Sequence, residues 1–543
     1  MTSISRTALL FLIWIGLAAG PALAKGTHPV TGEPLADDQS FTYRILDEPS
    51  SLDPQMTEDV AGAEIVRDLF EGLFNQDENG ELVPGVATGF DLSPDKKTYT
   101  FHLRDTARWS NGAPVTARDF VYAWRRLADP ATKSPYQWFM ELMSLENNGA
   151  VSAGFKPPED LGVSAIDDRT LEVRLEKPLP YFPQMTVHTV TFPVPGDIIA
   201  QFGSDWTRPE HIVSNGAYVL SAHEPGKRVV RVRNPLYWDN AHTILDRVEA
   251  HVISDEKTSI TGFFTGDLDR TDVPMGIFQK LQKRYPDETV SFPRLCNYYV
   301  TFNLSDKGPE AFKDKRVRQA LSLAIDREVI TDQILGGGQT EAYTFTPPFV
   351  AGFKPPDTDI FWMTQDERDS KARALLAEAG YGPGGHRLSF TYLYNTSAAH
   401  KRISEAIAQM WREKLGVDVN IADVEWRTFL ETRGHQDFDL ARGGWCGDYN
   451  EASTFLDLLD SRSGYNDGKY ANPRVDALLS EAKTADNPAP LYTEIEQILA
   501  DEVPVIPIYH YSGSYLLSSD LKNWPVKNVE QNWYSKNLYK IAR

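Results

Sequence analysis

The residue types most able to bind a ligand or to react lie in the stretch RGGWCGDYNEAS, which runs from Arg442 to Ser453. It contains Cys446, one of only two cysteines in 543 residues, and Asp448 follows two positions later. Glycines surround this cysteine, so we expect a turn. An aspartate in such a turn either hydrogen-bonds to its own backbone or offers a fixed negative charge to a ligand.

The first 24 residues have the layout of a secretory signal peptide. A single basic residue, Arg6, precedes an apolar run from Ala8 to Ala19, and a proline and small residues lead to Ala24. The apolar run is shorter than the roughly 18 residues that span a membrane, which disfavours an N-terminal anchor. We expect cleavage after Ala24, and no cysteine follows that point to carry a lipid, so a lipoprotein is not expected.

Export would place both thiols in an oxidising compartment, where Cys296 and Cys446 are expected to form one disulfide. Closing so long a loop stabilises a fold by roughly 5 kcal/mol at best, because it restricts the unfolded chain. The alternative is two separate buried thiols.

The bulk composition excludes several classes of partner. The formal charge is −21, and removing Arg6 with the signal peptide makes it −22, which argues against nucleic acid and anionic membranes. No later segment is apolar enough to span a bilayer, so the mature protein is expected to be exported, soluble and monomeric. A chain of this length needs two or three lobes.

The two halves of the chain have different hydrophobic periods. Residues 98–103 and 170–175 alternate apolar and polar side chains, as half-buried strands do. The second half instead predicts helices and strands in alternation, which is typical of an α/β lobe. The segments concerned are helices at 314–335, 369–379 and 400–416 and strands at 388–395 and 417–424. The last residues return to a strand-like aromatic pattern, which suggests that the C-terminus rejoins the first lobe.

The motifs of common enzymes are absent from the sequence. HEPGK at 223–227 lacks the second histidine of a zinc protease, and we find neither a nucleophile elbow nor a phosphate-binding loop. The 11 histidines are scattered without metal-ligand spacing. We therefore expect no catalytic residue, no metal and no cofactor, although a secreted hydrolase with an unfamiliar site stays open as an alternative.

Several stretches together resemble the periplasmic oligopeptide-binding proteins of ABC importers, and they do so in order along nearly the whole mature chain. They are EPSSLDPQ (48–55), YTFHLRDTARWSNGAPVTARDFVYAWRR (99–126), SNGAYVL (214–220), NPLYWD (234–239), DKRVRQALSLAIDRE (314–328), TPP (346–348), LYNTSAAHK (393–401), LGVDV (415–419) and WRTFLETRGHQDFDLARGGWCGDYNEASTFL (426–456).

The resemblance implies an α/β fold, a two-lobed clamshell of three domains that closes over a peptide. Matching the segments assigns residues 25–70, 196–295 and 516–543 to a discontinuous domain I, 71–195 to domain II and 296–515 to domain III. Cys296 and Cys446 match the positions of the family's disulfide.

The resemblance also implies a role for Asp448, which matches the acid that binds the α-ammonium of the peptide. An amine that loses its water in a closed cleft needs a fixed counter-charge to stay ionised. Arg442, Arg433 and His400 match residues that meet the peptide carboxylate at different peptide lengths. The alternatives are ion pairs of Arg433 and Arg442 with Asp437 or Asp439, and a solvent-facing His400.

Two aromatic residues and two strands complete the predicted site. Tyr136 and Trp426 match aromatics that line the cleft, although core packing explains either one equally well. The strand of residues 442–446, which includes Gly444, and a strand expected at 46–50 would bind the peptide backbone from both sides. Such main-chain bonding selects peptides by their length and extended conformation, not by the identity of their side chains.

One departure from the family pattern concerns the carboxylate end. Where relatives carry a lysine for short peptides, this chain has Gln333, Ile334 and Leu335, which weakens any inference about peptide length. The resemblance implies a periplasmic receptor whose partners are short peptides and a membrane permease with ATPase subunits. Murein peptide, glutathione-like molecules or haem remain alternative cargoes for the same fold.

Overall fold

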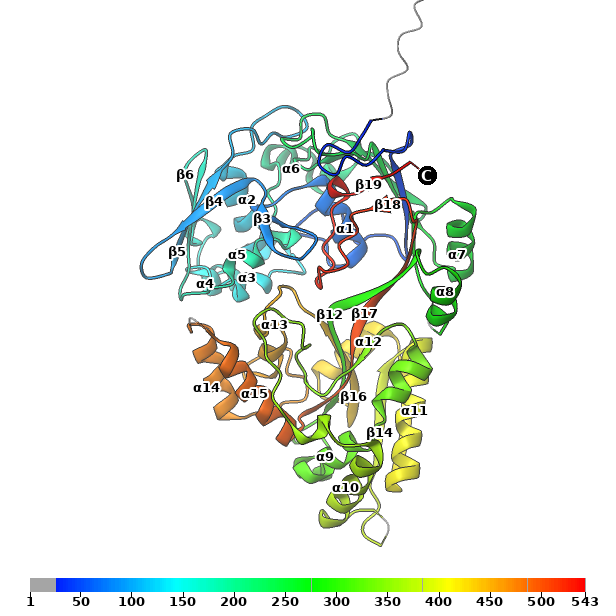
Figure 1. Cartoon of the computed structure of the whole chain (residues 1–543). Helices are drawn as coiled ribbons and strands as arrows, with labels where there is room; N and C mark the ends of the chain where they lie inside the picture. Colours follow the sequence, from blue (N-terminus) through cyan, green and yellow to red (C-terminus); the bar gives the residue numbers. More distant parts are fainter. Residues whose placement is uncertain (1–25, 275, 383, 486, 543) are drawn as a thin grey trace, which may run out of the picture.

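The computed structural model describes residues 26–274, 276–382, 384–485 and 487–542. It shows two lobes, one holding both the N-terminal part of the described chain and the C-terminal segment, the other holding the middle of the second half (Figure 1). The predicted signal peptide and its cleavage site lie outside the described residues. Within the described residues, no helix combines the length and apolar character that crossing a membrane requires.

A mixed β-sheet runs through both lobes. In spatial order its strands are β15 (Asp418–Val424), β14 (Ser389–Asn395), β16 (Leu440–Cys446), β12 (Thr289–Phe302), β17 (Val505–Leu517), β11 (Arg270–Asp272), β1 (Ser40–Ile45), β10 (Arg247–Val252), β9 (Arg228–Arg233) and β8 (Tyr218–Glu224), with β13 (Thr340–Glu341) beside β17. The long strands β12 and β17 pair antiparallel and pass from one lobe to the other (Figure 1). They are therefore the main covalent connections between the lobes.

The first lobe carries a second sheet of β4 (Ala87–Leu92), β5 (Thr98–Leu103), β7 (Thr170–Arg174) and β6 (Val163–Asp167). The predicted alternation is confirmed, because Tyr99, Phe101 and Leu103 are buried and the residues between them are not. Helix α2 (Ala117–Ala128) packs on this sheet. The short hairpin of β2 (Phe74–Gln76) and β3 (Leu82–Pro84) and helix α1 (Val60–Leu69) belong to the same lobe.

Shorter elements complete the first lobe. They are α3 (Phe139–Leu142), α4 (Asn148–Ser152), α5 (Phe182–Met185), α6 (Gly196–Phe202), α7 (Glu256–Thr265), α8 (Phe278–Arg284) and the pair β18 (Leu521–Lys522) and β19 (Tyr539–Lys540). The last two strands bring the C-terminus back to the first lobe, as the aromatic pattern predicts (Figure 1).

The second lobe has the predicted alternation of helices and strands. Its helices are α9 (Lys315–Leu323), α10 (Gln365–Glu378), α11 (Ala398–Leu415), α12 (Trp426–Gly434), α13 (Ser453–Leu456), α14 (Pro473–Ala482) and α15 (Ala489–Glu502). Helix α11 buries Ile403, Ile407 and Trp411 on one face. Helix α10 begins at Gln365, earlier than predicted, because Thr364 and Glu367 form a capping box at its N-terminus.

The single helix predicted at 314–335 is wrong in its middle. Helix α9 ends at Leu323, and a separate π-helical segment covers Val329–Leu335. The break places the guanidinium of Arg327 in the interior, where it donates to the carbonyls of Ser322 and Ala342 at 3.2 and 2.8 Å. Satisfying a buried charge with backbone carbonyls outweighs continuing the helix.

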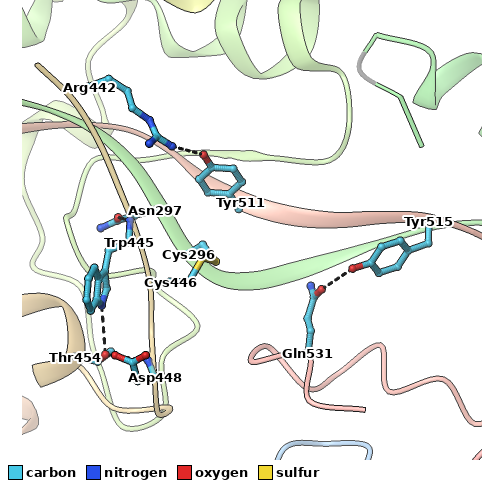
Figure 2. The surroundings of a disulfide bond; sticks show 10 residues. All are labelled: Cys296, Asn297, Arg442, Trp445, Cys446, Asp448, Thr454, Tyr511, Tyr515 and Gln531. Atoms are coloured by element: carbon cyan, nitrogen blue, oxygen red, sulfur yellow. Dashed lines mark hydrogen bonds between the residues drawn. A yellow bond between two sulfur atoms is a disulfide. The ribbon is translucent and has the colours of Figure 1, made fainter. Parts of the chain in front are cut away.

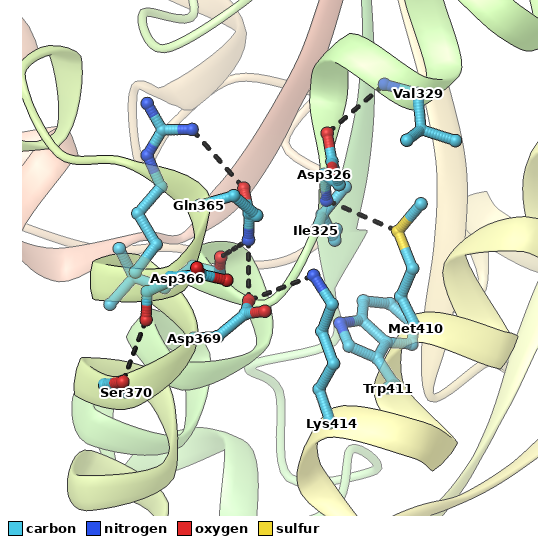
Figure 3. A network of polar contacts seen from close by, with 12 residues as sticks. Ile325, Asp326, Val329, Gln365, Asp366, Asp369, Ser370, Met410, Trp411 and Lys414 are labelled. Atoms are coloured by element: carbon cyan, nitrogen blue, oxygen red, sulfur yellow. Dashed lines mark hydrogen bonds and ion pairs between the residues drawn. The ribbon is translucent and has the colours of Figure 1, made fainter.

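A polar network fixes the helices of the second lobe to this break (Figure 3). The amide of Gln365 donates to the Leu323 carbonyl at 3.0 Å and to Asp369 at 2.6 Å, and Lys414 pairs with the same Asp369 at 3.0 Å. Helices α10 and α11 are thus tied to the end of α9, so the lobe is a firm base for β14, β16 and β12.

The strand predicted at 46–50 is also wrong. Strand β1 ends at Ile45, and the following residues form bends in which the Glu48 carboxylate accepts from the Gly226 backbone N–H at 2.7 Å. The prolyl residue at 49 and the polar sequence around it leave no strand pairing for this segment.

Candidate ligand-binding site

Strand β16 forms the backbone of the site. It pairs antiparallel with β12 along its whole length, from Leu440 to Cys446. On its other side, β14 pairs with it only at Leu440 and Ala441. In the described part of the chain, the remainder of this edge, from Arg442 onward, therefore has no strand beside it. An extended peptide could add to that edge through main-chain hydrogen bonds.

The two cysteines form a disulfide, as predicted, and it joins β12 to the end of β16 (Figure 2). Cys296 and Cys446 lie directly opposite each other in the ladder. Just beyond, the Gly447 N–H donates to the Leu295 carbonyl at 2.7 Å, and the Asp448 N–H donates to Thr454 Oγ1 at 3.1 Å. Two consecutive backbone N–H groups thus fix the turn that carries Asp448.

A cavity of about 200 Å³ opens beside this turn, at the place where the lobes meet. Its walls come from both lobes and from the crossing strands. They comprise residues of the loop before α1 and of α1 itself, Tyr136, Val187 to Thr189, Arg294 to Cys296, Cys446 to Asp448, Tyr515, and Val529 to Asn532.

The carboxylate of Asp448 is one of the polar groups of this wall that has a buried atom without a partner. Its Oδ2 is shielded from solvent and has no hydrogen-bond partner. Burial, together with the nearby charge of Glu530, raises the pKa of Asp448 to about 7. A carboxylate that caps its own turn would instead accept backbone N–H groups, so the geometry favours the ligand-binding interpretation over the capping one.

Arg442 occupies the opposite end of β16 from Asp448 (Figure 2). Its guanidinium donates to the Tyr511 hydroxyl at 3.3 Å and to Asn395 Oδ1 at 3.5 Å, and it lies over the Tyr298 ring. No carboxylate pairs with it among the described residues, and its Nε is buried without a partner. The ion pair with Asp437 or Asp439 does not form: Lys307 pairs with Asp437 at 2.8 Å.

Gly444 lies between Arg442 and Asp448, at a position where a side chain would pack tightly. A Cβ at this position would meet the Arg442 Nη2 at 3.0 Å and the Asn297 carbonyl at 3.2 Å. The absent side chain therefore leaves room for the guanidinium to fold along the strand and keeps the backbone of β16 approachable.

His400 lies in the first turn of α11, near Arg442. Its ring is 5.6 Å from that of Tyr298, and its Nδ1 is buried without a partner. Burial and the Arg442 charge lower the pKa of His400 to about 3, so the imidazole is neutral at pH 7. As a neutral ring it can donate one hydrogen bond but contributes no charge.

Of the predicted residues whose side chains are described, Asp448 and Tyr136 line this cavity, whereas Arg442, Gly444, His400 and Arg433 do not. Arg433 is buried and pairs with Asp467 at 2.7 Å, so its charge is already compensated, although by a different partner from those considered above. Trp426 begins α12, and its side chain lies outside the described part of the molecule.

Tyr136 does line the cavity, as predicted, and it belongs to an aromatic group that the sequence analysis missed in part. Its ring stacks on His188 at 5.0 Å and contacts Trp138 at 5.1 Å. Burial and the charge of Arg67 lower the pKa of His188 to about 3, so this ring is also neutral. No spacing signal pointed to His188, because it comes from a distant segment.

Aromatic contacts hold the two lobes together at the edge of the cavity. Tyr181 of the first lobe stacks on Tyr449 at 5.0 Å, and Trp138 lies 5.6 Å from Tyr465 and 6.5 Å from Trp445. Tyr449 follows Asp448 directly, so the turn that carries the carboxylate also carries a side chain that docks on the opposite lobe. The turn that carries Asp448 is therefore in direct contact with the first lobe.

The site thus presents the half-buried carboxyl group of Asp448 and the half-buried guanidinium of Arg442, neither of which forms an ion pair with another described residue. The described residues contain no group of three or more side chains that could hold a metal ion. The arrangement fits reversible capture of an extended zwitterion.

These features define a two-lobed, clamshell binding protein, which confirms the predicted fold class. The chain matches the family model described as bacterial extracellular solute-binding proteins, family 5 middle, over residues 81–467. The protein belongs to this family of solute-binding proteins.

Named relatives extend the similarity over the full chain. The chain is 42% identical to the periplasmic murein peptide-binding protein MppA of Escherichia coli over 96% of its length and 97% of the relative. It is also 42% identical to the periplasmic oligopeptide-binding protein OppA of Salmonella typhimurium, with 100% of both chains covered. The solved structure of the E. coli murein tripeptide-binding protein MppA superposes with a TM-score of 0.82 over 94% of this chain and 100% of that chain.

Proposed function

We propose that the protein is the periplasmic binding component of an ABC importer and captures short peptides between its lobes. The observation that carries this proposal is the buried, unpartnered carboxylate of Asp448 in a cavity that both lobes line. It would receive the peptide's α-ammonium, which is the group that a low-dielectric anionic site selects.

The other end of the peptide would meet Arg442. Arg442 lies four residues before the end of β16, which is about 13 Å along an extended strand, and Asp448 lies in the turn two residues beyond that end. Once their side chains reach inward, a peptide of about four to five residues would span them. The peptide backbone would pair with the open edge of β16, so affinity would depend on free termini and extension more than on side-chain identity.

Closure would be a hinge motion about β12 and β17. The boundaries 295/296 and 515/516 of the proposed domains I and III fall within these two strands, and a register shift between Pro293 and Asn297 lies at the first of them. We assign residues 25–70, 196–295 and 516–543 to domain I, 71–195 to domain II and 296–515 to domain III. A ligand that contacts Asp448 and the first lobe at once would stabilise the closed state.

The proposed location is the periplasm, after cleavage behind Ala24, without a lipid anchor and as a monomer. Two of the relatives are named as periplasmic peptide-binding proteins. The physiological partners would be the membrane permease and its ATPases, to which the closed complex delivers its cargo. Catalysis is not part of this proposal.

Murein peptide is a second candidate cargo, because the identity to MppA equals that to OppA. Both cargoes carry an α-ammonium, so the site chemistry above serves either. Mass spectrometry of ligand that stays bound through gentle purification separates them by composition.

Calorimetry with tri- to pentapeptides tests the function itself. We expect dissociation constants of about 1 µM or below, equivalent to about −8 kcal/mol. N-acetylation of the same peptides should weaken binding strongly, since it removes the charge that Asp448 neutralises. Equal affinity for free and acetylated peptides would refute the assignment.

A further inference from the structure

A second carboxylate, that of Glu530, lies in the same cavity as Asp448 but comes from the opposite lobe. Glu530 belongs to the C-terminal segment that returns to the first lobe, whereas Asp448 follows β16 of the second lobe (Figure 1). The two residues are far apart in the sequence, and no motif connects them.

The backbone of Leu295 hydrogen-bonds to the residues that precede Glu530 and Asp448. The Leu295 N–H donates to the Val529 carbonyl at 2.6 Å, and the Leu295 carbonyl accepts from the Gly447 N–H at 2.7 Å. Val529 precedes Glu530, and Gly447 precedes Asp448. Glu530 and Asp448 therefore each follow a residue that hydrogen-bonds to Leu295 of β12, which precedes Cys296 of the disulfide.

The segment that carries Glu530 is fixed to the first lobe. Gln76 of β2 donates to the Glu530 carboxylate and accepts from Asn532 Nδ2 at 2.8 Å. Asn528 Oδ1 accepts from the Glu530 N–H at 3.0 Å, and Gln531 accepts from the Tyr515 hydroxyl at 3.1 Å. The carboxylate is thus held in place before any ligand arrives, which reduces the ordering cost of binding.

Neither acid has an ion-pair partner among the described residues. The guanidinium of Arg67, whose charge acts on Glu530, donates a hydrogen bond to Asn532 instead. Burial, opposed by the Gln76 hydrogen bond and by Arg67, raises the pKa of Glu530 to about 7. The other charged or titratable side chains of the cavity wall are Glu58, Asp59, Glu64, Tyr136, His188, Arg294 and Tyr515.

Most of those groups are already engaged or neutral. Asp59 caps α1 through the Gly62 N–H at 2.7 Å, and Glu64 pairs with Arg270 at 3.4 Å. His188 is neutral at pH 7.

Arg67 and Arg294 are the cations of the wall. The charge of Arg67 opposes the rise in the pKa of Glu530, but in the described part of the chain neither arginine forms an ion pair with Asp448 or Glu530. A single α-ammonium would therefore pair with only one of the two carboxylates.

We propose that Glu530 is a specificity-determining residue that selects peptides with a second positive charge beside the α-ammonium, as in an N-terminal lysine. This inference rests on the proposed function, because Asp448 is taken to hold the α-ammonium. With the lobes closed, the side-chain ammonium of the first residue reaches Glu530, so that the dication bridges carboxylates of both lobes. A cargo without the second charge leaves one buried carboxylate unpaired.

Competition calorimetry with Lys-Ala-Ala and norleucine-Ala-Ala at pH 7.5 tests this selection. The two peptides have similar length and differ chiefly in the terminal charge. We expect the wild type to bind the lysine peptide at least tenfold more tightly. The attraction between the lysine ammonium and the Glu530 carboxylate is only weakly screened in a poorly hydrated site. In Glu530→Gln, which keeps an acceptor for Gln76, the preference for the lysine peptide over the norleucine peptide should fall below threefold.

A matched control is Glu81→Gln, which removes one negative charge from an exposed position outside the cavity wall and should retain the wild-type preference. Equal wild-type affinities for the two peptides, or a preference that survives in Glu530→Gln, would overturn the inference. The wild-type comparison is informative even if the variant fails to fold. If neither peptide binds the wild type, the proposed function fails together with the inference that rests on it.

Discussion

Burial of the Asp448 carboxylate should lower the free energy of unfolding of the ligand-free protein by a measurable amount. A carboxyl whose folded pKa is about 7, against an ordinary value of about 3.9, binds its proton more tightly in the folded state. The folded wild type therefore loses stability as pH rises from about 4 to 7, and Asp448→Asn removes that loss. The amide also relieves the repulsion with Glu530.

The magnitude follows from the size of the shift. Three pKa units correspond to about 4 kcal/mol, which is a ceiling. The residue as a whole is only partly buried, although Oδ2 is shielded, so about 1–2 kcal/mol is a realistic gain. For a lobe of this size each kcal/mol moves the melting temperature by about 2–4 °C, so the variant should melt about 2–8 °C higher at pH 8.

Differential scanning calorimetry of the ligand-free wild type and Asp448→Asn, at pH 4 and pH 8, is the assay. The gain should be present at pH 8 and be mostly lost at pH 4, where the aspartate is protonated in the folded state and about half protonated in the unfolded chain. A variant that melts below the wild type at pH 8 would refute the reasoning, because it would show that Asp448 holds its own turn together.

Three further perturbations test other parts of the structure. Replacing Cys296 and Cys446 together by serine should lower the free energy of unfolding, measured by urea titration, by up to about 5 kcal/mol. Adding reductant to this variant should have no further effect. An unchanged urea midpoint would show that the disulfide does not stabilise the fold. Arg433→Met should cost about 3–5 kcal/mol in the same assay because it leaves Asp467 buried and unpaired, and adding Asp467→Asn should recover part of the loss; full stability of the single variant would argue against the ion pair. The imidazole NMR shifts of His188 and His400 should keep their neutral values from pH 8 to 5, with stability falling only as pH drops below about 6.5, and titration near pH 6.5 would contradict their burial.

The sequence allowed the periodic elements to be predicted well because their signals are local. The alternation at 98–103 and the helical stripe of α11 depend on neighbouring residues, and both form as predicted. The helix at 314–335 was mispredicted because the buried Arg327 takes its partners from Ala342 and Pro507, which lie well beyond the helix. Tertiary partners of this kind leave no periodic signal.

The site was predictable only where it coincides with one continuous stretch. Arg442, Gly444, Cys446 and Asp448 share the stretch that ends β16, and their order alone places them along one edge. Glu530 and His188 reach the cavity from other segments, so their proximity depends on how the chain folds back. Conversely, Arg433 resembles a ligand-binding arginine in sequence, yet its charge is satisfied by Asp467.

The interaction of Asp448 with a peptide amine is tested most directly by a double-mutant cycle that combines Asp448→Asn with N-acetylation of a tetrapeptide. For the wild type, acetylation should reduce affinity by two orders of magnitude or more, since it leaves a buried carboxylate unpaired. For Asp448→Asn, the free and acetylated peptides should bind within about threefold of each other, so that the coupling energy is close to the whole effect of acetylation. If acetylation weakens binding to both proteins equally, the amine lies elsewhere and the account of this site is wrong.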